Sequence, residues 1–111
     1  MSGRQIPRAV QMALKELQEY LAKIYGERLR GIYLYGSYAR GDFRSDSDVD
    51  VLIALEGTVN PSQEIDLIGD GVADICLEHN VLIGTFPVPE EWLKVRKSPL
   101  FENVRREGIR L

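Results

Sequence analysis

Apolar side chains recur along the first part of the chain with the period of an α-helix. Over residues 6–25 they follow one another at spacings of four, three, four and three, and most charged residues fall outside this stripe. This spacing puts the apolar residues on one face, so we expect a helix that covers a core. Gly26 follows the pattern at the place of a C-cap glycine. The apolar positions are Val10, Leu14, Leu17, Leu21 and Ile24.

Two short apolar segments have the character of β-strands. Residues 31–36 (GIYLYG) are rich in aromatic side chains and bounded by glycines. Residues 48–56 (DVDVLIALE) contain a nearly continuous run of Val, Leu and Ile, which indicates a strand covered on both faces. Between the two strands the chain makes a turn, and we expect a short helix to begin there at Ser37.

Residues 60–79 favour a helix over a strand. The segment opens with an Asn-Pro pair, typical of an N-cap followed by the first helical residue, and its apolar residues then keep a helical spacing. Gly69 and Gly71 oppose this interpretation, since each costs about 1 kcal/mol relative to alanine in a helix interior. The alternative of a strand over residues 72–78 is therefore kept.

The remaining elements complete an alternating pattern. Residues 81–88 predict a third strand, near an edge of the sheet because Pro87 cannot donate a backbone hydrogen bond. A short helix is expected to start near Glu90, and another is expected over residues 99–106. The order α-β-α-β-α-β-α predicts an α/β (α+β) fold, a small three-stranded mixed sheet flanked by helices.

Composition narrows the class of protein. The chain has 111 residues, 44% of them hydrophobic, which suits one domain over residues 1–111. Its net charge of −3 lacks the basic excess that direct nucleic-acid binding usually requires. No apolar run approaches the roughly 18 residues of a membrane span, and the N-terminus lacks the apolar part of a signal peptide. The single cysteine, Cys76, cannot form an internal disulfide, so we expect a protein of the reducing cytoplasm. Together these observations predict a cytoplasmic protein without membrane association.

The candidate functional residues lie between the first two predicted strands, in the segment YGSYARGDFRSDSDVDVLI. Gly36 ends a strand and lets the backbone approach a ligand closely, because it has no Cβ. Ser37 offers a hydroxyl and a backbone N–H at the start of a helical turn, which suits a phosphate group. Arg40 can add a charge-assisted phosphate contact or can be a surface arginine, and the sequence favours neither.

Two carboxylates follow at the start of the second strand. Residues i and i+2 of a strand point to the same face, so Asp48 and Asp50 should project side by side while Val49 turns into the core. Neighbouring carboxylates repel unless a cation lies between them. Mg²⁺ typically binds one or two carboxylates together with substrate phosphates, and such all-oxygen ligands also suit Mn²⁺. A phosphate-binding turn that faces a pair of metal-binding carboxylates is an arrangement suited to phosphoryl transfer.

This segment resembles the signature of the minimal nucleotidyltransferases of the DNA polymerase beta superfamily, which is Gly-Ser, ten residues, then Asp-x-Asp. Here Gly36 and Ser37 are followed by residues 38–47 and then by Asp48 and Asp50. The resemblance implies a nucleotidyltransferase fold and the transfer of AMP from Mg-ATP to a hydroxyl acceptor. It further implies that the Gly-Ser pair takes the triphosphate and that the two aspartates are catalytic metal ligands.

The same resemblance implies a third carboxylate, on a later strand, that helps to activate the attacking hydroxyl. Asp74 could supply it only if residues 72–78 form a strand. In a helix, Asp74 points away from the apolar face to solvent. The predicted strand over residues 81–88 contains no acid. Asp74 is therefore a conditional member of the catalytic set.

Three functions follow from these patterns. The C-terminal segment SPLFENVRREGIRL resembles the C-terminus of stand-alone minimal nucleotidyltransferases that are encoded beside HEPN-domain partners. This implies an antitoxin that adenylylates a HEPN-type toxin, since a chain this short has little room to bind its own acceptor. The second hypothesis is a catalytically weak or inactive module that neutralises its partner by binding alone. The third, transfer to a small molecule, needs a substrate-binding element that we do not find. Self-association of the chain is left open.

The other polar residues have simpler interpretations. His79, the only histidine, is expected to be structural at a helix end. Cys76 lies on the apolar stripe and is expected to behave as a small buried hydrophobe. Asp42 and Asp46 are interpreted as capping or solvated acids.

Overall fold

Four strands form one mixed sheet in the computed structural model, which describes residues 5–111. β1 (Leu29–Tyr35) pairs antiparallel with β2 (Val49–Leu55), and β2 pairs parallel with β3 (Ile83–Pro89). β4 (Ile109–Arg110) adds to β1, which gives the order β3-β2-β1-β4. The expected three-stranded sheet therefore has a fourth strand, because two residues are too few to show the alternation that identifies a strand in a sequence.

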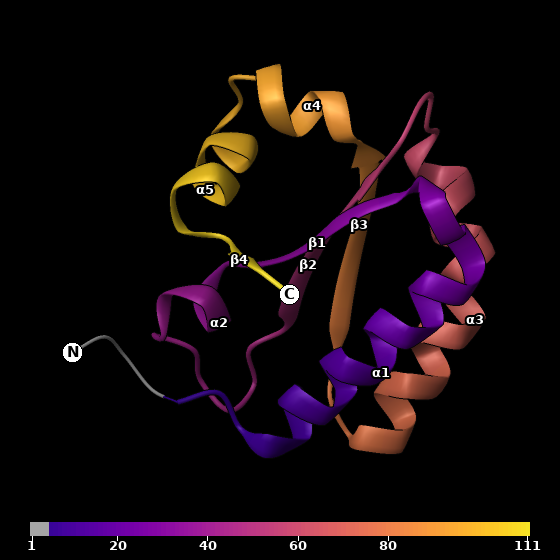
Figure 1. Cartoon of the computed structure of the whole chain (residues 1–111). Coiled ribbons are helices and arrows are strands. Elements are labelled where there is room, and N and C mark those ends of the chain that lie inside the picture. Colours follow the sequence, from indigo (N-terminus) through magenta and orange to yellow (C-terminus); the bar gives the residue numbers. More distant parts are fainter. Residues whose placement is uncertain (1–4) are drawn as a thin grey trace.

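Helices cover both faces of this sheet (Figure 1). They are α1 (Arg8–Tyr25), the 3₁₀ turn η1 (Gly26–Arg28), α2 (Ser37–Arg40), α3 (Pro61–His79), α4 (Glu90–Val95) and α5 (Pro99–Glu107). α1 and α3 pack side by side against one face, whereas α4 and α5 pack against the other. Every helix predicted from the sequence is present, and the α/β class is confirmed.

β2 is an inner strand of the sheet, and its two faces contribute side chains to a hydrophobic core on each side. Its odd-numbered residues face α1 and α3, and its even-numbered apolar residues face α4 and α5. The odd set is Val49, Val51, Ile53 and Leu55, and the even set is Leu52 and Ala54. All six are at most 1% exposed, which explains their nearly continuous hydrophobicity. Asp50 shares the parity of Leu52, so its carboxylate emerges on the face of α4 and α5.

α3 is one continuous helix, so the alternative of a strand over residues 72–78 is wrong. The side chain of Asn60 accepts hydrogen bonds from two backbone N–H groups of the first turn, at 3.1 and 3.4 Å. Gly71 has a packing role, because the ring of Tyr20 on α1 lies where a Cβ of residue 71 would be. Tertiary packing thus explains one of the two glycines that weaken the helical pattern.

α1 ends at Gly26, as its sequence predicts. Gly26 has a φ of 55°, a backbone conformation that glycine adopts more easily than other residues. Ile24, expected on the buried stripe, is 40% exposed, and Tyr25 occupies the buried position instead. Across residues 5–111, neither α1 nor any other helix has the length and apolar character needed to cross a membrane.

Candidate active site

The antiparallel pairing of β1 and β2 brings the Gly-Ser turn to the Asp-x-Asp segment. Tyr35, the last residue of β1, is the register partner of Asp50 near the start of β2. Gly36 and Ser37 follow Tyr35 directly, so they lie at the same end of the sheet as Asp50. The structure therefore brings together the residues from which the sequence predicts a nucleotide and metal site.

Gly36 lies directly against the carboxylate of Asp50. A Cβ at position 36 would collide with Oδ2 of Asp50. The φ of Gly36 is 76°, which disfavours any residue with a side chain. Its carbonyl accepts hydrogen bonds from the N–H groups of Ala39, at 3.1 Å, and Arg40, at 3.0 Å, and so starts α2. Glycine is thus needed here both for the backbone turn and for close approach to the site.

Ser37 is the first residue of α2 and is partly exposed beside Gly36. Because α2 is a single turn, it contributes little helix dipole. The hydroxyl of Ser37 is therefore a more specific group for binding a phosphate than the helix dipole is. The turn is anchored by the buried rings of Tyr38 and Phe43, which stack with their centroids 4.3 Å apart. The anchored aromatic pair holds the Ser37 turn against the sheet.

The two aspartates differ in environment. Asp48 precedes β2 and is exposed, whereas Asp50 lies in β2 and is partly buried. Burial raises the pKa of Asp50, the negative charge of Asp48 raises it further, and the positive charge of Arg40 opposes both. Asp48 lies two residues before Asp50 along the chain, close enough for its charge to act on the Asp50 carboxyl. A divalent cation fits such a pair, since it would neutralise the repulsion.

Arg40 is already engaged by two acidic side chains. Its Nε lies 3.2 Å from Oδ2 of Asp42, and its Nη1 lies 3.2 Å from Oε1 of Glu107. Asp42 is therefore an ion-pair partner, and Glu107 links the end of α5 to the turn. The sequence could not find the link to Glu107, because the two residues are 67 positions apart. A phosphate would compete with both carboxylates for Arg40.

Asp74 lies on the other side of the sheet from Asp50. It is exposed on α3, which packs with α1 against the odd-numbered face of β2. It lines a cavity of about 370 Å³ between these two helices, together with Glu19 and Lys23. The strand on which its catalytic assignment depended is absent. Asp74 is accordingly not placed to act with Asp50.

Gly84 is the residue of β3 that pairs with Asp50. A Cβ at position 84 would have Oδ1 of Asp50 as its nearest neighbour, at 4.0 Å. No acidic residue occurs in β3, so the position next to Asp50 on the adjacent strand carries no carboxylate. Sequence reasoning did not single out Gly84, because the β2–β3 register is not readable from either strand alone.

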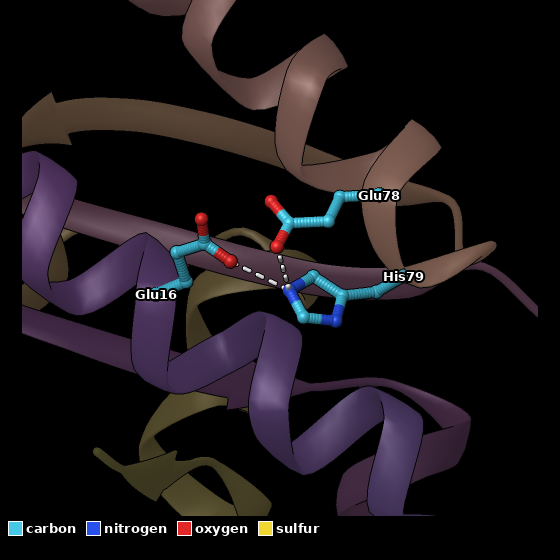
Figure 2. A group of neighbouring side chains, drawn as sticks. All are labelled: Glu16, Glu78 and His79. Atoms are coloured by element: carbon cyan, nitrogen blue, oxygen red, sulfur yellow. Dashed lines mark hydrogen bonds and ion pairs between the residues drawn. The ribbon is translucent and has the colours of Figure 1, made fainter.

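A second polar cluster links α1 to α3 (Figure 2). Nε2 of His79 lies 2.6 Å from Oε2 of Glu16 and 3.9 Å from Oε2 of Glu78. The hydrogen bond from His79 lowers the pKa of Glu16. Three potential metal ligands do converge here, but the hydrogen bond between His79 and Glu16 already occupies the imidazole nitrogen. We interpret the cluster as a structural link, the role expected for His79.

Comparison with known proteins identifies the class. A family model described as "Nucleotidyltransferase domain" matches residues 14–97. The chain is also 36% identical over 97 residues to MJ0604, a candidate protein adenylyltransferase of Methanocaldococcus jannaschii. That alignment covers 86% of this chain and 91% of the relative. The chain therefore belongs to the nucleotidyltransferase domain family and is a nucleotidyltransferase, of the minimal type that its Gly-Ser and Asp-x-Asp pattern resembles.

Solved structures agree with this fold. A toxin–antitoxin structure with AMP-PNP superimposes with a TM-score of 0.61 at 18% identity, over 86% of this chain and 69% of the other. A mutant of the toxin–antitoxin MntA-HpeT also gives a TM-score of 0.61 at 18% identity, over 96% of this chain and 72% of the other. At this identity the likeness establishes the nucleotidyltransferase fold alone.

Proposed function

We propose that this chain transfers AMP from Mg-ATP to a hydroxyl group of a partner protein, with Asp48 and Asp50 as the metal ligands. The placement of Gly36 against Asp50, through the Tyr35–Asp50 register, is the observation that carries the proposal. Gly36 and Ser37 receive the triphosphate beside the two carboxylates. Bound Mg²⁺, or Mn²⁺ in its place, supplies positive charge that offsets the charge of the phosphates and of both aspartates.

The residues of the chain contribute mainly binding and orientation to this reaction. The acceptor oxygen forms a bond to the α-phosphorus of ATP while the bond to the oxygen of the β-phosphate breaks, and pyrophosphate leaves. The proton of the acceptor hydroxyl must go to a base. Because β3 has Gly84 beside Asp50, this proton goes to water or to a group of the acceptor protein.

The proposed partner is supported by similarity to named proteins. MJ0604 is named as a candidate protein adenylyltransferase, and two solved structures of this fold are toxin–antitoxin complexes. The described residues 5–111 form one sheet and its covering helices, which supports a single minimal domain. We propose a HEPN-type toxin as the acceptor and an antitoxin role for the chain.

A second function is favoured by one specific observation. With Gly84 in place of an acid next to Asp50, the site lacks the third carboxylate expected for efficient hydroxyl activation. The alternative is a weak or inactive nucleotidyltransferase-like module that neutralises its partner by binding alone. In that case substitutions at Asp48 and Asp50 would leave neutralisation unchanged.

The first test is titration with ATP in the presence and absence of Mg²⁺. We expect binding that needs Mg²⁺ and weakens by about tenfold or more in Asp48→Asn and in Asp50→Asn, since each removes a charged metal ligand. Asp74→Asn is the matched control, the same chemical change on the opposite face of the sheet. Equal loss in the control, or metal-independent binding in all variants, would place the nucleotide elsewhere.

The second step separates the two functions. The purified chain and its partner are incubated with ATP labelled in the α-phosphate, and the protein-bound label is counted. Label on the partner that is lost in Asp50→Asn supports transfer of AMP. Metal-dependent ATP binding without label on the partner favours the module that acts by binding alone.

A further inference from the structure

An open apolar groove runs between α3 and the outer edge of β3. It has a volume of about 560 Å³. Three of its lining residues are large exposed hydrophobics: Ile65 at 40%, Leu77 at 81% and Leu82 at 61% exposure. Exposed apolar side chains gathered in one groove mark a contact surface more often than isolated ones do.

Acidic side chains border this groove along α3. Asp66 and Asp70 lie one helical turn apart and are exposed next to the groove residues Ala73 and Leu77, whereas Asp74 lines the cavity between α1 and α3. α3 contains no lysine or arginine, so these charges are not balanced within the helix. The opposite wall, formed by residues 82–85, carries no charge. The surface therefore suits an apolar ligand with positive charge on the side that lies over α3.

The edge of β3 favours a helical ligand over an added strand. Pro87 and Pro89 lie in β3 and have no backbone N–H to donate. Prolines on an edge strand disfavour the pairing of another strand along it. A helix that places apolar side chains in a groove needs no backbone hydrogen bonds from β3.

A second copy of the chain does not match the groove. The apolar faces of α1 and α5 are buried in the two cores, so neither helix has an apolar face to offer. A symmetric contact between two α3 helices would bring their acidic rows together, and like charges across an interface oppose association. Among the described residues, no other long helix is available.

We propose that this groove docks an amphipathic helix of the partner protein, with apolar side chains between α3 and β3 and Lys or Arg over the acidic row of α3. Ile83 and Thr85 line the groove on either side of Gly84, the residue that pairs with Asp50. The groove itself lies on the α3 face of the sheet, opposite to the Asp50 carboxylate, so the docked helix attaches the partner and another part of the partner supplies the acceptor hydroxyl. The inference rests on the proposed function only in taking the docked protein as the acceptor.

The groove is tested without nucleotide, so that its failure and a failure of AMP transfer are distinguished. The probe is a fluorescent synthetic peptide of about 18 residues, long enough to form a helix, with Leu at helical spacing on one face and Lys on a flank. The control peptide carries Glu in place of Lys. We expect the Lys peptide to bind and the Glu peptide not to, with binding that weakens as salt is added.

Matched variants of the chain locate the binding. Leu77→Ser should weaken binding of the Lys peptide by about tenfold, because Leu77 is the most exposed apolar side chain of the groove. Leu67→Ser is the control, since Leu67 is 57% exposed on the same helix but does not line the groove. The double variant Asp66→Asn, Asp70→Asn should weaken binding and reduce its salt dependence. Circular dichroism checks that each variant is folded.

Three outcomes would overturn the proposal. The first is equal binding of the Lys and Glu peptides, and the second is an equal effect of Leu67→Ser and Leu77→Ser. The third is a dimer in analytical ultracentrifugation that dissociates in Leu77→Ser, which would make a second copy the occupant. Peptide binding at the groove without AMP transfer to any partner would leave the docking surface standing and refute the proposed function.

Discussion

Gly84 and Asp50 face each other across the parallel β2–β3 pair. The resemblance to the nucleotidyltransferases implies a third carboxylate on a later strand, and we propose that position 84 is the place for it. The space for a side chain exists, since the nearest atom to a Cβ at position 84 is 4.0 Å away. Gly84 also has no positive φ that would resist substitution. At the scale of single residues, the site therefore differs from a three-carboxylate site by one side chain.

This difference can be tested by gain of function. We expect Gly84→Asp to increase the rate of AMP transfer by about tenfold or more, because the added carboxylate can accept the proton of the acceptor hydroxyl. Gly84→Asn has nearly the same volume without the charge and is the control. The measurement is the initial rate of label incorporation into the partner at saturating ATP. If both variants have the same rate, the missing carboxylate is not what limits the reaction.

The two long helices are held together by different contacts along their length. Gly71 of α3 accommodates the ring of Tyr20, whose hydroxyl donates a hydrogen bond of 3.3 Å to the carbonyl of Ile68. Gly69, two residues earlier, has no atom within 4 Å of the place where its Cβ would be. The two glycines of one helix should therefore respond in opposite ways to the same substitution.

Gly69→Ala should stabilise the protein by about 0.5–1 kcal/mol, since alanine is the better helix former and meets no neighbour. Gly71→Ala should destabilise it by about 1–3 kcal/mol, because the added methyl displaces Tyr20. Urea unfolding followed by circular dichroism gives both free energies of unfolding. The packing argument is wrong if the two variants shift stability in the same direction.

The Glu16–His79 contact gives the α1–α3 packing a dependence on pH. In the folded protein, the hydrogen bond from His79 lowers the pKa of Glu16, so folding favours the charged form of this carboxylate. The stability from this carboxylate is present above its ordinary pKa of 4.5 and is lost as pH falls through the lowered value. Glu16→Gln should thus be less stable than the wild type at pH 7, and the difference should disappear in acid.

Unfolding curves over a pH series measure this effect. Glu19→Gln is the control, because Glu19 lies on the same helix without an ion pair to His79. An effect of Glu16→Gln that stays constant down to acidic pH would mean that the side chain acts through packing and not through its charge.

At the scale of the whole molecule, contacts local in sequence were predictable and distant ones were not. The period of α1, the Asn60 cap of α3 and the parity of β2 each depend on residues only a few positions apart. The pairing of Asp50 with Gly84 and the contact between Arg40 and Glu107 join segments that no local pattern relates. The sequence therefore predicted that the Gly-Ser turn and the two aspartates lie together, but it suggested Asp74 as a third carboxylate, and Asp74 lies in α3 on the opposite face of the sheet.

The Tyr35–Asp50 pairing also has a consequence for how such a protein can evolve. The candidate site is enclosed within one antiparallel strand pair and the turn that joins it, residues 29–55. The long helices and the C-terminal helices pack around this unit. A lineage can therefore remodel the outer helices to suit a new partner while it inherits the chemical centre as one uninterrupted piece of chain.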